Sequence, residues 1–74
     1  MEFSNMKRIF IHSKSGKKYE LLEDHAKSSE TLEELVVYKA LYGNKQVWVR
    51  PRSMFFEDVI IEGKLVPRFK EIKL

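Results

Sequence analysis

The fold depends on the arrangement of residues 32–50, which read LEELVVYKALYGNKQVWVR. Residues 32–42 fit a helix, because Thr31 and Glu34 have the spacing of a capping box and Gly43 is a typical residue just after a helix end. The Val-Val-Tyr run in the middle of the same segment favours a strand equally well, since branched and aromatic side chains favour extended backbone. The local pattern therefore leaves both structures open for this segment.

The residues that follow this segment favour a β-hairpin. Residues 46–50 read QVWVR and alternate in the manner of a strand, and a Gly-Asn-Lys turn at 43–45 precedes them. Two β-prone runs around a Gly-Asn pair are typical of a hairpin. Pro51 ends the strand, because proline has no N–H to donate to a neighbouring strand.

The rest of the chain consists of short extended runs joined by polar turns. Strands are expected at residues 8–12, 19–22, 58–62 and 66–72, the last interrupted by Pro67. The connections are expected to be a turn at 13–18, a polar loop at 23–31, a single 3₁₀ turn at 52–56 and a turn at 63–64. Short strands with tight turns in so small a chain predict an all-β fold that forms a small barrel.

The composition excludes several classes of protein. The chain has 74 residues and no cysteine, so disulfides and thiolate zinc sites are absent. Charged residues interrupt every apolar run, which excludes a transmembrane helix and the core of a signal peptide. We expect a soluble cytoplasmic protein with no cofactor and no bound metal. Residues 1–6 show no periodicity and are expected to form a flexible N-terminal tail, with residues 7–74 as the single domain.

Several sequence motifs together resemble a known family. They are Ser29-Glu30-Thr31, the run from Glu34 to Gly43, Trp48-Val-Arg-Pro51, Met54-Phe55 and Pro67-Arg68-Phe69. In order and spacing they resemble the bacterial domain-of-unknown-function 1653 family over residues 9–72, and the pattern of His12, Gly16 and Tyr19 is similar to its N-terminal hairpin.

The resemblance implies an SH3-like barrel of five or six antiparallel strands, and it favours a strand for residues 32–42. It implies no activity and no ligand. The family usually has a histidine just before Ser-Glu-Thr, whereas this chain has Ser28 there and His25 is out of register. A site that requires a second histidine beside His12 is therefore in doubt.

One predicted strand face combines aromatic and basic side chains. Tyr38 and Tyr42 are four residues apart and share a face, as do Trp48 and Arg50 across the turn. Such a surface stacks bases and neutralises phosphates, and the same residue types dominate protein interfaces. The candidate ligand-binding residues are His12, Tyr38, Tyr42, Trp48, Arg50, Arg52 and Arg68.

A structural interpretation competes with this binding role. In so small a barrel some aromatic side chains fill the core, and Phe55 and Phe69 are the stronger candidates, whereas Trp48 and Tyr38 are left open between core and surface. The arginines also have potential partners in an acidic segment, where a structural polar network is predicted. Its residues are Ser29, Glu30, Thr31 and Glu34, with Arg50 or Arg68 paired to Glu30 or Glu34.

The sequence favours a non-catalytic binding module over the other function classes. Bases gather in residues 1–18, 39–52 and 64–74 and acids in 20–34 and 57–62, so the partner is expected to be a protein or a nucleic acid. The alternatives are a homo-oligomeric accessory protein that pairs through an exposed edge strand, and a small enzyme that uses His12. No phosphate-binding loop, nucleophile elbow or HExxH motif supports the enzyme. No membrane association is expected.

Overall fold

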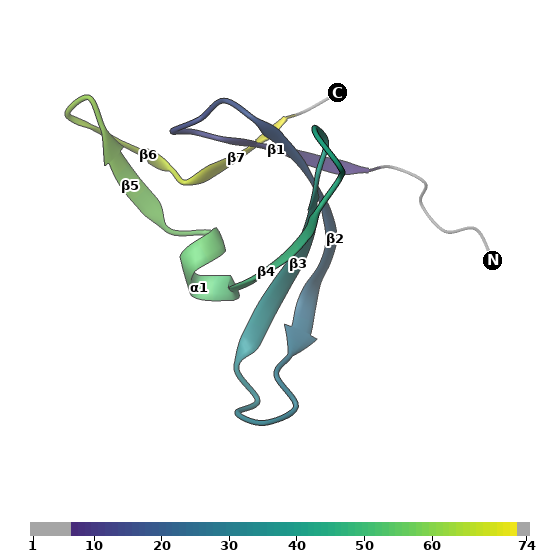
Figure 1. Cartoon of the computed structure of the whole chain (residues 1–74). Helices are drawn as coiled ribbons and strands as arrows, with labels where there is room; N and C mark the ends of the chain where they lie inside the picture. The colour runs from purple at the N-terminus through teal and green to yellow at the C-terminus, as the bar shows by residue number, and fades with distance from the viewer. Residues whose placement is uncertain (1–6, 73–74) are drawn as a thin grey trace.

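The structure, a computed structural model, describes residues 7–72. Its elements are β1 (Arg8–His12), β2 (Lys18–Lys27), β3 (Glu34–Ala40), β4 (Val47–Pro51), α1 (Arg52–Phe55), β5 (Asp58–Ile61), β6 (Lys64–Pro67) and β7 (Phe69–Ile72). The strands form a five-stranded sheet in the order β4-β3-β2-β1-β7 and a two-stranded sheet of β5 and β6. All pairings are antiparallel. In Figure 1 the large sheet curves, and the β5–β6 hairpin projects from one side of it.

The open question about residues 32–42 is settled in favour of a strand. β3 alternates between half-buried side chains and the buried Val36, Tyr38 and Ala40, which is the period-2 pattern of a strand with one face on the core. The hydroxyl of Thr31 accepts the backbone N–H of Glu33 at 3.2 Å. It therefore closes a turn before β3, where the capping-box pattern suggested a helix start.

Several elements differ from the sequence prediction. The polar loop predicted at 23–31 is wrong in its first half, because β2 continues to Lys27 and pairs with β3 through two register shifts. Polar side chains are tolerated there because this end of the hairpin extends away from the core and is largely exposed (Figure 1). The 3₁₀ turn predicted after Pro51 is instead a one-turn α-helix, α1, in which the N–H of Phe56 bonds the carbonyl of Arg52. The predicted hairpin at residues 8–22 is confirmed.

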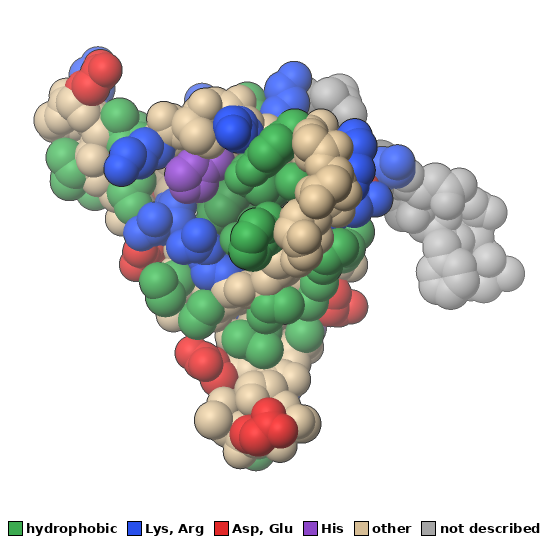
Figure 2. Space-filling view, in the orientation of Figure 1, with side chains coloured by type: hydrophobic (Ala, Val, Ile, Leu, Met, Phe, Trp, Pro, Cys, Tyr) green, Lys and Arg blue, Asp and Glu red, His purple; other side chains and the backbone are tan. Residues whose placement is uncertain are grey.

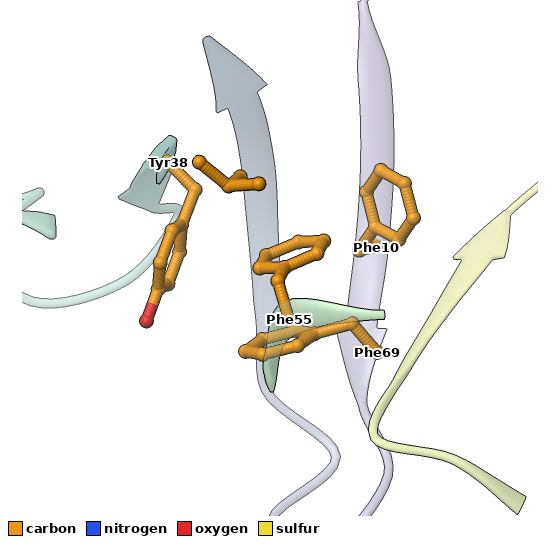
Figure 3. Close-up of a cluster of buried hydrophobic side chains, with 5 residues drawn as sticks. Phe10, Tyr38, Phe55 and Phe69 are labelled. Carbon is orange, nitrogen blue, oxygen red and sulfur yellow. The ribbon is translucent and has the colours of Figure 1, made fainter. Parts of the chain in front are cut away.

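The core is a small cluster of aromatic rings around α1. Its buried members are Phe10, Val36, Tyr38, Phe55 and Phe69. Phe55 is fully buried, and its ring stacks on Phe69 with centroids 4.2 Å apart, while Phe10 and Tyr38 meet it edge-on (Figure 3). The prediction that Phe55 and Phe69 are core residues is confirmed, because the short helix places one ring from the chain's middle against one from β7.

The predicted all-β fold class is confirmed, but residues 7–72 form seven strands where five or six were predicted. The single strand expected at 66–72 is divided into β6, which begins at Lys64 inside the predicted turn and pairs with β5, and β7, which pairs with β1. β4 and β7 are the edges of the large sheet, and closure into an SH3-like barrel stays a prediction. The predicted tail at residues 1–6 lies outside the described residues. Within those residues, no helix is long and apolar enough to span a membrane.

Candidate functional site

A groove of about 350 Å³ is lined by residues of β1, β2, β3, β4 and β7 and of the turns that follow β1 and β3. Its lining residues are His12, Ser15, Lys17, Tyr19, Tyr38, Tyr42, Trp48, Arg50 and Phe69. Figure 2 shows lysine and arginine side chains gathered with hydrophobic ones on this upper part of the molecule, while acidic side chains mark the tip of the β2–β3 hairpin below. None of the described residues that line the groove is acidic. The groove is thus aromatic in its walls and positive in its charge.

Trp48 forms the open wall of the groove. It lies on β4 directly opposite Tyr38 on β3, so the two side chains share one face of the sheet, as the alternation predicted. Tyr38 is buried, whereas the Trp48 side chain is 51% exposed. Tyr38 is therefore a core residue and Trp48 a surface residue, because Tyr38 lies on an inner strand and Trp48 on the edge strand.

The tyrosines of the groove are linked by hydrogen bonds and edge-on ring contacts. The hydroxyls of Tyr19 and Tyr42 are 2.8 Å apart, and the Tyr19 ring meets those of Tyr38 and Tyr42 edge-on at 5.5 and 5.6 Å. Burial, followed by the hydrogen bond to Tyr42, raises the pKa of Tyr19 to about 12. The Tyr19 hydroxyl therefore stays protonated at neutral pH, and its hydrogen bond to Tyr42 fixes both rings in the floor of the groove.

Two basic side chains, Arg50 and Lys17, lie against the aromatic rings. Arg50 donates its Nε–H to the Tyr38 hydroxyl at 3.3 Å, and its guanidinium carbon lies 5.7 Å from the centre of the Phe69 ring. The Lys17 ammonium lies 4.6 Å from the centre of the Tyr42 ring. No ion pair involves Arg50 or Lys17 among the described residues. Their charges are thus available to an anion.

The family of the chain follows from its match to a family model. The model described as Protein of unknown function (DUF1653) matches residues 8–71, which is most of the chain. The chain belongs to this family. No curated protein and no solved structure shows a significant match. Membership of DUF1653 confirms the predicted resemblance and brings no function with it.

His12 on β1 also lines the groove of this DUF1653 domain. Its Nδ1 lies 3.1 Å from the Ser15 hydroxyl, and its ring meets Phe69 at 5.0 Å. Burial lowers the pKa of His12, and the positive charges of Arg50, Arg68 and Lys14 lower it further. The imidazole is therefore neutral at pH 7.

This lowered pKa predicts how the stability of the DUF1653 domain depends on pH. The unfolded chain binds a proton at His12 more readily than the folded chain. The contribution of neutral His12 to the free energy of unfolding is therefore complete above its ordinary pKa of 6.5 and is lost as the pH falls below that value. Urea unfolding followed at several pH values between about 5 and 8 measures this slope. We expect a smaller slope in His12→Gln, and an unchanged slope would contradict the assignment.

The groove contains most, but not all, of the predicted binding residues. Arg68 lies outside it and lines a neighbouring hollow, which it shares with His12. Arg52 is elsewhere, because its Nε–H donates to the carbonyl of Asp24 at 3.0 Å and its guanidinium covers the Phe56 ring. Arg52 is thus a structural residue that joins α1 to β2, and its inclusion among the ligand-binding residues is not supported by its position.

The predicted pairing of Arg50 or Arg68 with Glu30 or Glu34 is wrong. Arg68 pairs with Glu57, and Arg50 bonds Tyr38. The Ser29-Glu30-Thr31 turn and neighbouring Glu34 lie at the tip of the β2–β3 hairpin, at the opposite end of the molecule from β7 (Figure 1). This tip is organised locally, since the Ser28 hydroxyl accepts the N–H groups of Glu30 and Thr31.

An arginine with two acidic partners does join the sheet, at a place that the sequence did not suggest. Arg8 on β1 bonds Glu71 on β7 at 2.9 Å and Asp24 on β2 at 3.4 Å. Three neighbouring strands are therefore linked by one guanidinium. Because these residues are 16 and 63 positions apart, only the strand order brings them together.

Four residues of the groove were not predicted from the sequence, namely Ser15, Lys17, Tyr19 and Phe69. The β2–β3 pairing places Tyr19 opposite Ala40, which is two residues along the chain from both Tyr38 and Tyr42. The signal that points to Lys17 and Tyr19 is their place where the turn of the first hairpin leads into its second strand. Nothing local indicates Phe69, which reaches the groove through β7.

Proposed function

We propose that this protein is a non-catalytic module that binds single-stranded nucleic acid in the aromatic groove. The observation that carries the proposal is the half-exposed Trp48 beside two unpaired cations, Arg50 and Lys17, in a groove whose described lining contains no acid. A cytoplasmic location belongs to the same proposal.

The groove suits one base and its adjoining phosphate. Exposed indole and phenol rings give every base a face on which to stack, and this contact does not depend on sequence. Trp48 supplies the open face and Tyr42 the second ring, while Arg50 and Lys17 lie close enough to the rings to meet the phosphate. A volume of about 350 Å³ is at the lower end for a small-molecule site and accommodates a single nucleotide rather than a folded partner.

The contacts of His12 support binding rather than catalysis. A serine nucleophile needs a base held in place by a third group and donors for an oxyanion. Here Ser15 and His12 close the β1–β2 turn: the N–H of Ser15 donates to His12 Nδ1 at 3.4 Å, and the Ser15 hydroxyl accepts the N–H of Lys17 at 3.2 Å. The pair thus shapes the turn that carries Lys17 to the groove.

The fluorescence of Trp48 tests the proposal directly, because it is the single tryptophan of the chain. Titration with an oligothymidylate and an oligouridylate at low salt is expected to give saturable quenching. The logarithm of the binding constant should fall with the logarithm of the salt concentration by about 0.7 for each phosphate neutralised.

Two results would contradict the proposal. Absence of quenching by both oligonucleotides at low salt would exclude stacking on Trp48. Quenching that is insensitive to salt would exclude phosphate contacts from Arg50 and Lys17, and it would favour a peptide ligand in the groove.

A further inference from the structure

A second hollow, of about 420 Å³, lies between the β5–β6 hairpin and the end of β1. On one side it is lined by the consecutive residues Val59, Ile60, Ile61 and Glu62, and on the other by His12, Lys14 and Arg68. His12 borders both this hollow and the aromatic groove, but the two have otherwise different linings. The second hollow is aliphatic along β5, with one acid, Glu62, at the hairpin turn, and it is basic on the other side.

The hollow runs along the edge of β5. Side chains along a strand point alternately to opposite faces, so a hollow touched by consecutive strand residues follows the strand's edge. β5 is paired with β6 alone, and within residues 7–72 no backbone hydrogen bond from another element reaches Asp58–Ile61. The outer edge of β5 therefore presents unpaired backbone groups beside the hollow.

The hairpin geometry indicates which residues these are. Glu62 and Gly63 both have positive φ, of 51° and 79°, and form a two-residue turn closed by the pair Ile61 and Lys64. In an antiparallel pair the residues alternate between bonding the partner strand and facing away from it. Ile61 and Val59 therefore bond β6, whereas Ile60 and Asp58 direct their N–H and C=O groups outward.

The side chains around this edge define what it accepts. Ile60 and its cross-strand partner Leu65 are 66% and 65% exposed, so the hairpin offers an uncovered apolar pair. Lys14 is exposed and has no ion pair among the described residues. Arg68 lines the side of the hollow opposite the edge, and its guanidinium forms an ion pair with Glu57. The edge thus offers backbone groups for an extended chain, an apolar surface at Ile60 and a positive charge at Lys14.

We infer that the free edge of β5 binds an extended peptide in which apolar and acidic side chains alternate, and that this peptide adds a strand to the β5–β6 sheet. Addition of a strand to an exposed sheet edge is a common mode of peptide recognition, in which backbone bonds supply affinity and side chains supply specificity. This site goes beyond the proposed nucleic-acid groove and does not depend on it.

The test is an amide ¹H–¹⁵N NMR titration of the whole chain with a short blocked peptide of alternating valine and glutamate. We expect saturable shifts at Asp58 and Ile60, downfield as their N–H groups gain partners, while the indole N–H of Trp48 does not move. The same peptide with alternate N-methylated residues, which cannot bond the edge, should bind at least about tenfold more weakly.

A charge-reversed variant and a matched control test the role of Lys14. Lys14→Glu should weaken binding of the acidic peptide roughly three- to tenfold, as expected when one surface pair becomes repulsive. Lys70→Glu, an exposed lysine that borders a different hollow along β6, should change it less than twofold. Both substitutions are on the surface, so the spectra should show an intact fold.

Each of the following results would overturn the inference. The first is equal binding of the N-methylated and unmethylated peptides, and the second is a set of peptide-induced shifts confined to the Trp48 groove. The third is that oligonucleotides, but no peptide, shift the signals of Asp58 and Ile60. The fourth is occupation of the edge by a second copy of the chain. The last would be seen as a dimer in sedimentation without peptide. Failure of the oligonucleotide titration at Trp48 leaves these measurements unaffected, so the two proposals fail separately.

Discussion

Replacement of Phe55 by alanine is expected to lower the free energy of unfolding by about 3–5 kcal/mol. Phe55 is the largest fully buried side chain, and its ring contacts those of Phe10, Tyr38 and Phe69. The residue comes from a four-residue helix that cannot move far to close the cavity, since Pro51 and β5 hold its two ends. A chain of this length typically has about 4–11 kcal/mol of stability in total. Urea unfolding followed by circular dichroism measures the loss.

The neighbouring Phe56 is the matched control for this substitution. It is 38% exposed and meets Phe10 and Phe55 only edge-on, so Phe56→Ala should cost clearly less than Phe55→Ala. A loss below about 1 kcal/mol for Phe55→Ala would contradict a fully buried ring, because only surface substitutions usually change the free energy of unfolding by about 0.5 kcal/mol or less.

Replacement of Trp48 by alanine is expected to weaken oligonucleotide binding about 5- to 150-fold, since stacking contributes about 1–3 kcal/mol for each base. The fold should persist, because the side chain is half exposed on an edge strand. The variant has no tryptophan, so binding is measured by the fluorescence anisotropy of a labelled oligonucleotide, and the fold by circular dichroism.

The Val49→Ala variant is the control that distinguishes loss of the indole ring from a general weakening of β4. Val49 is 56% exposed and adjacent to Trp48, but strand alternation places it on the opposite face. The Val49→Ala substitution should leave the dissociation constant for the oligonucleotide within about twofold of that of the unsubstituted protein. Equal losses in the two variants would mean that binding depends on the stability of β4 rather than on the indole ring, and would contradict stacking.

Once the family resemblance had favoured a strand for residues 32–42, the alternating pattern of residues 34–50 predicted the face on which Tyr38, Trp48 and Arg50 meet. The period of side chains along a strand is a local property, and a short turn keeps two such strands in register. For the same reason, the first hairpin was predicted correctly. The choice between helix and strand for β3 was not local, because the same residues satisfy a helix signal at Thr31 and a strand signal at Val36.

The sequence by itself determined an all-β chain, two of its core phenylalanines and the aromatic and basic character of one strand face, because these follow from side-chain type and short-range periodicity. Only the tertiary structure decided which residues from elsewhere complete the groove and which partner each arginine takes. Tyr19 and Phe69 reach the groove through the strand order, and Arg68 pairs with Glu57 rather than Glu30 for the same reason. Charges and rings act over a few ångströms in space, and positions far apart in the sequence become neighbours only when the strands pair.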